Sequence, residues 1–289
     1  MKANILYFVI FLVPVLSLAQ KIPQRIYKNG ESYKYLLTTE NFNNNQFKDK
    51  TIAVSFHIVT QDSGYYGETI SWLSKTLINP KDTVQLDSIA KTVAPYRISL
   101  DPKGAVPLPA LIVPAMTGEI TDLNTFFVAV SPKMHIGKLS NAHPFYQDTS
   151  LLHGNFADGK EIIKGEDRIL ISQRLIGQTK KETIIESSFL PPKTMSLAPF
   201  IDTIATSFSE RPNNFQMIRK GDNGKVNLLW GVEEFIITTT LDNRTGKIKE
   251  ARMTNTLTLR MRYNCSPDLA TYAAEFPLLI SRELHLALQ

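Results

Sequence analysis

The sequence has one cysteine, Cys265, in 289 residues. No disulfide can therefore form within the chain. Exported proteins of this size from oxidising eukaryotic compartments often carry several cysteines, so this scarcity favours a bacterial periplasm or exterior. We expect this thiol to be a buried or incidental cysteine rather than a reactive one.

Long apolar runs are missing beyond the first twenty residues. Lys2, the apolar run 5–15 and the small residues Ser17 and Ala19 predict a cleavable export signal over residues 1–19. No cysteine follows the run as a site for a lipid anchor, and the run itself is short for a membrane span. We therefore expect a soluble periplasmic or secreted protein with no stable membrane anchor.

Strong charge of one sign is also missing. The formal net charge is +5 for the full chain. Loss of the signal with Lys2 lowers the charge to +4 and leaves 270 of the 289 residues, enough for a sizeable core. Basic residues are scattered and no phosphate-binding GxxxxGK[ST] loop occurs, so nucleic-acid binding is not expected.

Catalytic motifs are equally scarce. No HExxH or GxSxG motif is present, and the SxxK at Ser88 has none of the partner motifs that would make it a nucleophile. Three histidines and two aspartates gather in one loop-rich stretch, at His135, His143, His153, Asp158 and Asp167. Their spacing fits no known zinc pattern, and surface histidines are the preferred interpretation. We expect no metal and no cofactor, and nothing in the sequence specifies an enzyme.

The sequence does contain alternating patterns that are typical of β-strands. Residues 235–241 alternate with β-branched character, 242–246 supply a turn ending in Gly246, and a long alternating strand returns through Tyr263. Asn255 interrupts the apolar row of that return strand, which indicates a polar contact or a bulge. Just before the hairpin, Glu233 and Glu234 would face opposite sides of a strand, one of them toward a cleft, although solvated glutamates are the preferred interpretation.

Other segments extend the same pattern. Residues 52–59 predict a strand whose apolar row, Ile52 to Ile58, alternates with a polar side that carries His57. Residues 169–176 and 183–190 predict a hairpin, and 278–288 a final strand. Residues 119–130 have a possible helical face but could equally form a strand. The fold class expected is mainly β (α+β), with curved antiparallel sheet and a few short helices.

A weak internal repeat suggests two related halves. An Asp-to-Gly turn occurs at 101–104 and again at 242–246. The expected organisation is a signal over 1–19, an N-terminal sheet half over 20–116, a connecting segment over 117–154 and a C-terminal sheet half over 155–289. Chance similarity of ordinary hairpin turns explains the repeat equally well.

This layout, with its hairpins, two Asp-to-Gly turns and prolines at 107, 109 and 114, resembles the lipoprotein-carrier-like (LolA/LppX-type) group of secreted proteins. The resemblance implies a strongly curved antiparallel sheet, partly closed over helices, that holds a lipid or another apolar ligand. It covers most of the mature chain and depends on pattern rather than on a motif, so no site residue is carried over from it.

Two candidate sites lie on the return strand of the hairpin. Its apolar row is expected to line a ligand cavity with Met253, Leu257, Leu259 and Met261. Its polar row could bind a carboxylate, a phosphate or an acidic polymer through Arg252, Arg260 and Arg262. A solvated sheet face is the plainer interpretation of those arginines.

Three functional classes follow. The preferred one is a non-enzymatic exported protein that binds an apolar or lipid-like ligand in the cell envelope. The second is an envelope interaction or assembly component with a protein partner, which would present an exposed apolar or arginine-rich patch. The third and least favoured is a metal-dependent hydrolase built around residues 135–158.

Overall fold

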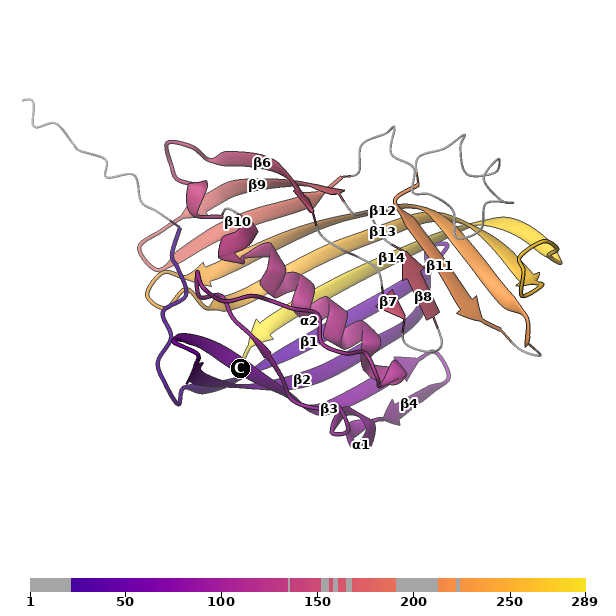
Figure 1. The fold of residues 1–289 in the computed structure, drawn as a ribbon, viewed down its shortest axis with the longest axis horizontal. Helices are drawn as coiled ribbons and strands as arrows, with labels where there is room; N and C mark the ends of the chain where they lie inside the picture. The colour runs from indigo at the N-terminus through magenta and orange to yellow at the C-terminus, as the bar shows by residue number, and fades with distance from the viewer. Residues whose placement is uncertain are drawn as a thin grey trace, which may run out of the picture.

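The computed structural model describes residues 22–134, 136–151, 156–157, 161–164, 168–190, 213–221 and 224–289. The fold is mainly β: one large, open antiparallel sheet with a few short helices, which confirms the expected fold class (Figure 1). The helices are α1 (Asp87–Ala90), α2 (Thr117–Ala129) and the 3-10 turns η1 (Pro114–Met116), η2 (Pro132–Met134) and η3 (Ile136–Lys138). The strands are β1 (Ser32–Asn43), β2 (Gln46–Asp62), β3 (Tyr65–Asn79), β4 (Asp82–Gln85), β5 (Tyr96–Ile98), β6 (Phe145–Leu151), β7 (Phe156–Ala157), β8 (Glu161–Lys164), β9 (Arg168–Gln178), β10 (Glu182–Phe189), β11 (Phe215–Lys220), β12 (Val226–Asp242), β13 (Ile248–Cys265) and β14 (Ala274–Leu288).

The main path of the sheet runs β4-β3-β2-β1-β14-β13-β12-β10-β9-β6. The first long strand, β1, therefore pairs with the last strand, β14, from Tyr35 opposite Leu288 to Asn43 opposite Ile280. This pairing joins strands from both ends of the chain into one sheet. It does not show whether the two predicted halves are a duplication, and that division stays a prediction.

The strongest sequence patterns gave the right elements. The predicted hairpin is β12 and β13, the second hairpin is β9 and β10, and the final strand lies within β14. The ambiguous segment 119–130 is helical, as α2. We call the sheet face that α2 crosses the inner face, and the opposite one the outer face (Figure 1).

Strand β2 buries the side that its sequence does not suggest. Ser55 and His57 face inward and are buried, whereas Val54 and Phe56 lie half-exposed on the outer face and Ile58 is 39% exposed there. His57 does lie on the polar side of the strand, as its alternation indicated, but that side is the buried one. The reason is tertiary: large aromatic rings from other elements fill the inner face and leave room there only for the smaller row.

The core lies between the inner face and α2. The helix contributes Ile120, Leu123, Phe126 and Phe127, all at most 1% exposed. They pack against Tyr35, Leu37, Ile70 and Trp72 from the sheet. Complete burial of side chains of this size is worth roughly 1.5–3 kcal/mol each. This packing fixes α2 across the inner face.

Two strands share one edge of β12. β10 pairs with residues 235–242 of β12, and β11 pairs with 226–231. The Asn214 side chain bridges the gap, since its Oδ1 accepts from Glu233 N at 2.8 Å and its Nδ2 donates to Glu233 O at 2.9 Å. Gly231 has φ +152°, and a Cβ there would lie 2.2 Å from Thr258 O. Only glycine fits this bend.

We predict that Gly231→Ala lowers the free energy of unfolding by about 3 kcal/mol, because the new methyl group strains the backbone and collides with β13. Urea denaturation measures the change. Gly177→Ala is the matched control, since a Cβ added at Gly177 would meet no atom within 4 Å. Equal effects at the two glycines would contradict the steric explanation.

Candidate functional site

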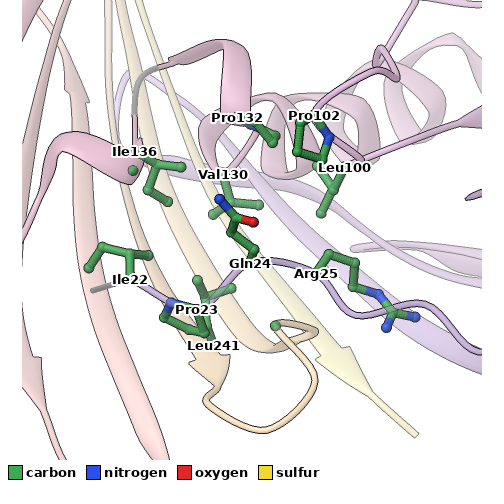
Figure 2. Close-up of a pocket in the computed structure, with 12 residues that line it drawn as sticks. Ile22, Pro23, Gln24, Arg25, Leu100, Pro102, Val130, Pro132, Ile136 and Leu241 are labelled. Carbon is green, nitrogen blue, oxygen red and sulfur yellow. The ribbon is translucent and has the colours of Figure 1, made fainter. Parts of the chain in front are cut away.

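A cavity of about 140 Å³ lies between the N-terminal segment, the end of α2 and the turn that joins β12 to β13 (Figure 2). Most of its lining is aliphatic or proline: it consists of Ile22, Pro23, Gln24, Arg25, Leu100, Pro102, Val130, Pro132, Ile136, Gly137, Leu241 and Gly246. Figure 2 shows the Gln24 amide among these apolar side chains and the Arg25 guanidinium directed away from them. The space therefore suits an apolar group.

The N-terminal segment forms one wall because it is tied to the β12–β13 turn. Ile26 N donates to Thr245 O at 2.8 Å. Asp242 shapes the turn by accepting from Arg244 N and Thr245 N, each at 2.8 Å. Gly246 has φ +66°, and a Cβ there would lie 2.2 Å from Gln24 O. Gly246 was predicted only as a turn residue. Its missing side chain also lets the N-terminal segment pack against the turn and close the cavity.

Arg25 connects the cavity wall to a buried polar network. Its guanidinium forms ion pairs with Glu31 at 2.9 Å and with Glu68 at 3.4 Å. It also lies 4.4 Å from the centroid of the Tyr27 ring, a cation–π distance. Because both its charge and its planar face are occupied, Arg25 anchors the segment instead of offering a free cation to a ligand.

The network continues as a Ser–His–Glu relay. Ser55 Oγ lies 3.0 Å from His57 Nε2, and His57 Nδ1 lies 3.0 Å from Glu68 Oε2. The imidazole stacks between Tyr33 and Phe127, with centroid distances of 5.4 and 5.7 Å. Burial alone would raise the pKa of Glu68, but hydrogen bonding and charge from His57, together with Arg25, hold that pKa below its usual range.

The order of contacts in this relay is that of a hydrolase nucleophile, base and orienting acid. However, Ser55 is 1% exposed, and both His57 and Glu68 are 0% exposed. A nucleophile must meet its substrate, and this hydroxyl lies inside the core. The geometry therefore supports a structural role: the relay ties β2 to β3 beneath α2.

The predicted ligand-binding row divides between two apolar clusters. Met253 packs in the main core beneath α2. Leu257 and Leu259 are buried in a second cluster with Phe215 and Leu229, against which Met261 packs. None of the four predicted residues lines the cavity of Figure 2. Their role in ligand binding stays a prediction.

The predicted arginine row lies on the outer face, as expected. Arg260 and Arg262 both bind Glu275, at 2.7 and 2.9 Å. Arg252 instead binds Glu250, at 2.7 Å. All three arginines thus form ion pairs with carboxylates of the chain itself, and anion binding by this row stays a prediction.

Most of the predicted histidine cluster lies outside the described residues, namely His135, His153, Asp158 and Asp167. His143 is exposed. Within the described part of the chain, no group of three His, Cys, Asp or Glu side chains could hold a metal ion. Among the same residues, no helix is both long and apolar enough to cross a membrane.

Sequence reasoning missed Arg25 and Glu68. Arg25 lies in a segment without periodicity, so nothing in the sequence links it to the sheet. Glu68 did offer a signal, because it is a charged residue inside the long strand β3, where burial requires a partner. The partner, His57 on β2, becomes evident only once the strand register is known.

No protein-family model matches the chain, and no curated protein matches it. Among solved structures, the chain is similar to one described as "lipid-protein interactions in lipovitellin", with 12% identity and a TM-score of 0.43. The alignment covers 91% of this chain and 25% of that one, so this chain spans about a quarter of the lipovitellin chain. The function proposed below depends on the cavity and not on this similarity.

We predict that Glu68→Gln lowers the free energy of unfolding by roughly 3–5 kcal/mol at pH 7, because it leaves the buried His57 without a carboxylate and Arg25 with Glu31 alone. In the unfolded chain the pKa of Glu68 is about 4.3, the ordinary value for glutamate. In the folded protein its pKa lies below that value. Its stabilisation is therefore complete above that pH and is lost as the pH falls toward the folded pKa. Urea denaturation from pH 3 to 7 should show a flatter profile in the variant.

The exposed Glu283→Gln serves as the control for this experiment. It should change stability by less than about 0.5 kcal/mol and leave the pH profile unaltered. A Glu68→Gln profile as steep as that of the wild type would contradict the assigned role of Glu68.

Proposed function

We propose that this protein binds an apolar or lipid-like ligand and that the cavity of Figure 2 receives an apolar part of it. The observation that carries the proposal is the cavity itself, about 140 Å³ in volume and lined mainly by aliphatic side chains and prolines. An engineered apolar cavity of about 150 Å³ binds benzene, so a space of this size is sufficient for one ring or a short stretch of chain.

The cavity does not enclose a whole lipid. Sites that hold a complete drug-sized ligand usually measure about 300–1,000 Å³. The bound group would therefore be the end of a chain or a ring, with the remainder of the ligand outside. Each methylene transferred from water contributes about 0.8 kcal/mol, so a few buried carbons suffice for selective though weak retention.

We place this activity in the cell envelope after export, with no enzymatic step. The predicted signal over residues 1–19 and the scarcity of cysteine support the location. The pattern-level resemblance to lipoprotein carriers supports the ligand class. The exclusion of solvent from the Ser55 relay supports a binding role over hydrolysis.

We predict that Val130→Phe fills the cavity and weakens benzene binding at least tenfold, because the added ring occupies the ligand's space. Val130 is 6% exposed and lines the cavity. Binding is measured by NMR titration with benzene and by the rise in Tm that benzene causes. The control is Ile176→Phe, at a side chain that is 47% exposed and outside the cavity.

Benzene that binds the filled variant as tightly as the wild type would refute the assigned site. A wild-type protein that binds neither benzene nor cyclohexane would refute the function. Native mass spectrometry of protein purified from its own envelope fraction should, in addition, detect a co-purified apolar molecule that Val130→Phe retains less well.

One observation favours the alternative, an envelope assembly component. The outer row of β2 is apolar and incompletely buried, with Val54 and Phe56 half-exposed and Ile58 39% exposed. A partner could cover such a row. A stable complex recovered from the envelope, and lost on Phe56→Ser, would support this alternative.

A further inference from the structure

A row of polar side chains crosses the inner face, where the flanking rows are apolar. Each member of the row pairs with the next across neighbouring strands. Asn255 of β13 lies opposite Arg282 of β14. Arg282 lies opposite Asn41 of β1, and Asn41 lies opposite Asp49 of β2. Arg282 Nε donates to Asn41 Oδ1 at 3.2 Å, and Asn41 Nδ2 donates to Asp49 Oδ1 at 2.5 Å. Asn255 thus marks a polar contact, one of the two outcomes its sequence position indicated.

Apolar residues lie on both sides of this row. Toward the main core, Met253 is paired with Leu284. Toward the other end of the strands, Leu257 is paired with Ile280, and Leu259 with Leu278. Leu257 and Leu259 are buried, whereas Ile280 and Leu278 are half-buried, so a ligand at the polar row would meet aliphatic surface chiefly at Ile280 and Leu278, with Leu257 next to them.

The positive charge of Arg282 is paired with a carboxylate of α2. Its guanidinium forms an ion pair with Asp122 of α2 at 2.5 Å, and the Asp122 side chain is only 6% exposed. Burial raises the pKa of Asp122, an effect that Arg282 opposes. Arg282 thus has its own counterion, and it acts on a second carboxylate only through space, with no ion pair between them.

That second carboxylate is Glu233. Its Oε1 accepts from Asn255 Nδ2 at 2.9 Å, and among the described residues it forms no ion pair. The two hydrogen bonds from Asn214 fix its backbone, so the side chain is held on the inner face. Burial raises the pKa of Glu233, while the hydrogen bond from Asn255 and the charge of Arg282 oppose this rise and the nearby Asp122 adds to it.

Asn255 supplies an independent sign of a missing ligand. The residue is 2% exposed, and its Oδ1 is a buried acceptor with no hydrogen-bond partner in the described structure. An unpaired buried acceptor costs about 1–3 kcal/mol. The carboxylate of Glu233 is hydrogen-bonded to the same amide group, so a donor placed between them would satisfy both.

We propose that Glu233 and Asn255 form a second binding site, for the ammonium group of an aliphatic amine whose chain lies on Leu257 and Ile280. An ammonium group has three donors and one positive charge, which match the carboxylate and the unpaired amide oxygen. A metal ion fits less well, because no group of three acidic, histidine or cysteine side chains in the described part of the chain could hold one.

This site is distinct from the cavity and goes beyond the function proposed above. Leu241 lines the cavity, whereas Glu233 lies eight residues earlier on the same strand. At about 3.3 Å per residue, the two positions are roughly 26 Å apart along β12. A ligand of modest length therefore occupies one site or the other.

The test compares octylamine with octanol by isothermal titration calorimetry on the full mature chain at pH 7. We expect octylamine to bind at least tenfold more tightly than octanol, and Glu233→Gln to abolish that preference. The neighbouring Glu234→Gln is the matched control, because Glu234 is exposed on the outer face and should leave the preference intact. Val130→Phe, which fills the cavity, should also leave it intact.

Several outcomes would overturn the proposal. They are equal affinity of the wild type for amine and alcohol, a preference that survives Glu233→Gln, and a preference lost on filling the cavity. Should Glu233→Gln not fold, NMR contacts in the wild type decide the matter. The methylene next to the octylamine nitrogen must then contact methyl groups of Leu257 or Ile280, and the absence of such contacts refutes the site.

Discussion

The packing of α2 on the inner face of the sheet is the constraint on which the other features depend. Apolar side chains hold the helix along its length, and two ion pairs, Lys75 with Glu119 and Arg282 with Asp122, attach it to the sheet at 2.7 and 2.5 Å. One end of the helix leads to Val130 in the cavity, while Phe127 covers the His57 relay. A shift of this helix would alter the ion pairs, the cavity and the relay together.

The polar groups of the inner face follow one physical rule. Each buried charge has an opposite charge and hydrogen bonds, as Arg25 has in Glu31 and Glu68, because an isolated ion in the core would be prohibitively costly. Glu233, which is half-buried, follows this rule only in part: among the described residues it forms no ion pair and meets only the through-space charge of Arg282, and the unpaired oxygen of Asn255 lies beside it. Departures of this kind tend to coincide with function.

The sequence allowed the long hairpins, the final strand and the mainly β class to be predicted, because period-2 patterns and turn residues are local signals. The buried side of β2 could not be predicted, because it is set by side chains of other elements, such as Trp72 of β3 and Phe127 of α2, whose packing cannot be read from the pattern of β2. Glu233 was correctly noted as one of two glutamates on opposite faces. Its contact with Asn255 required the register of β12 on β13.

The position of β14 has a consequence for how the chain is made. The last fifteen residues of strand form the middle of the sheet and not its border, since β14 lies between β1 and β13. Until they leave the ribosome, β1 and β13 each lack a neighbour and the sheet exists as two unconnected pieces. The sheet therefore stays divided until β14 has been made, and a substitution that prevents β14 from pairing would split the sheet in its middle instead of trimming its border.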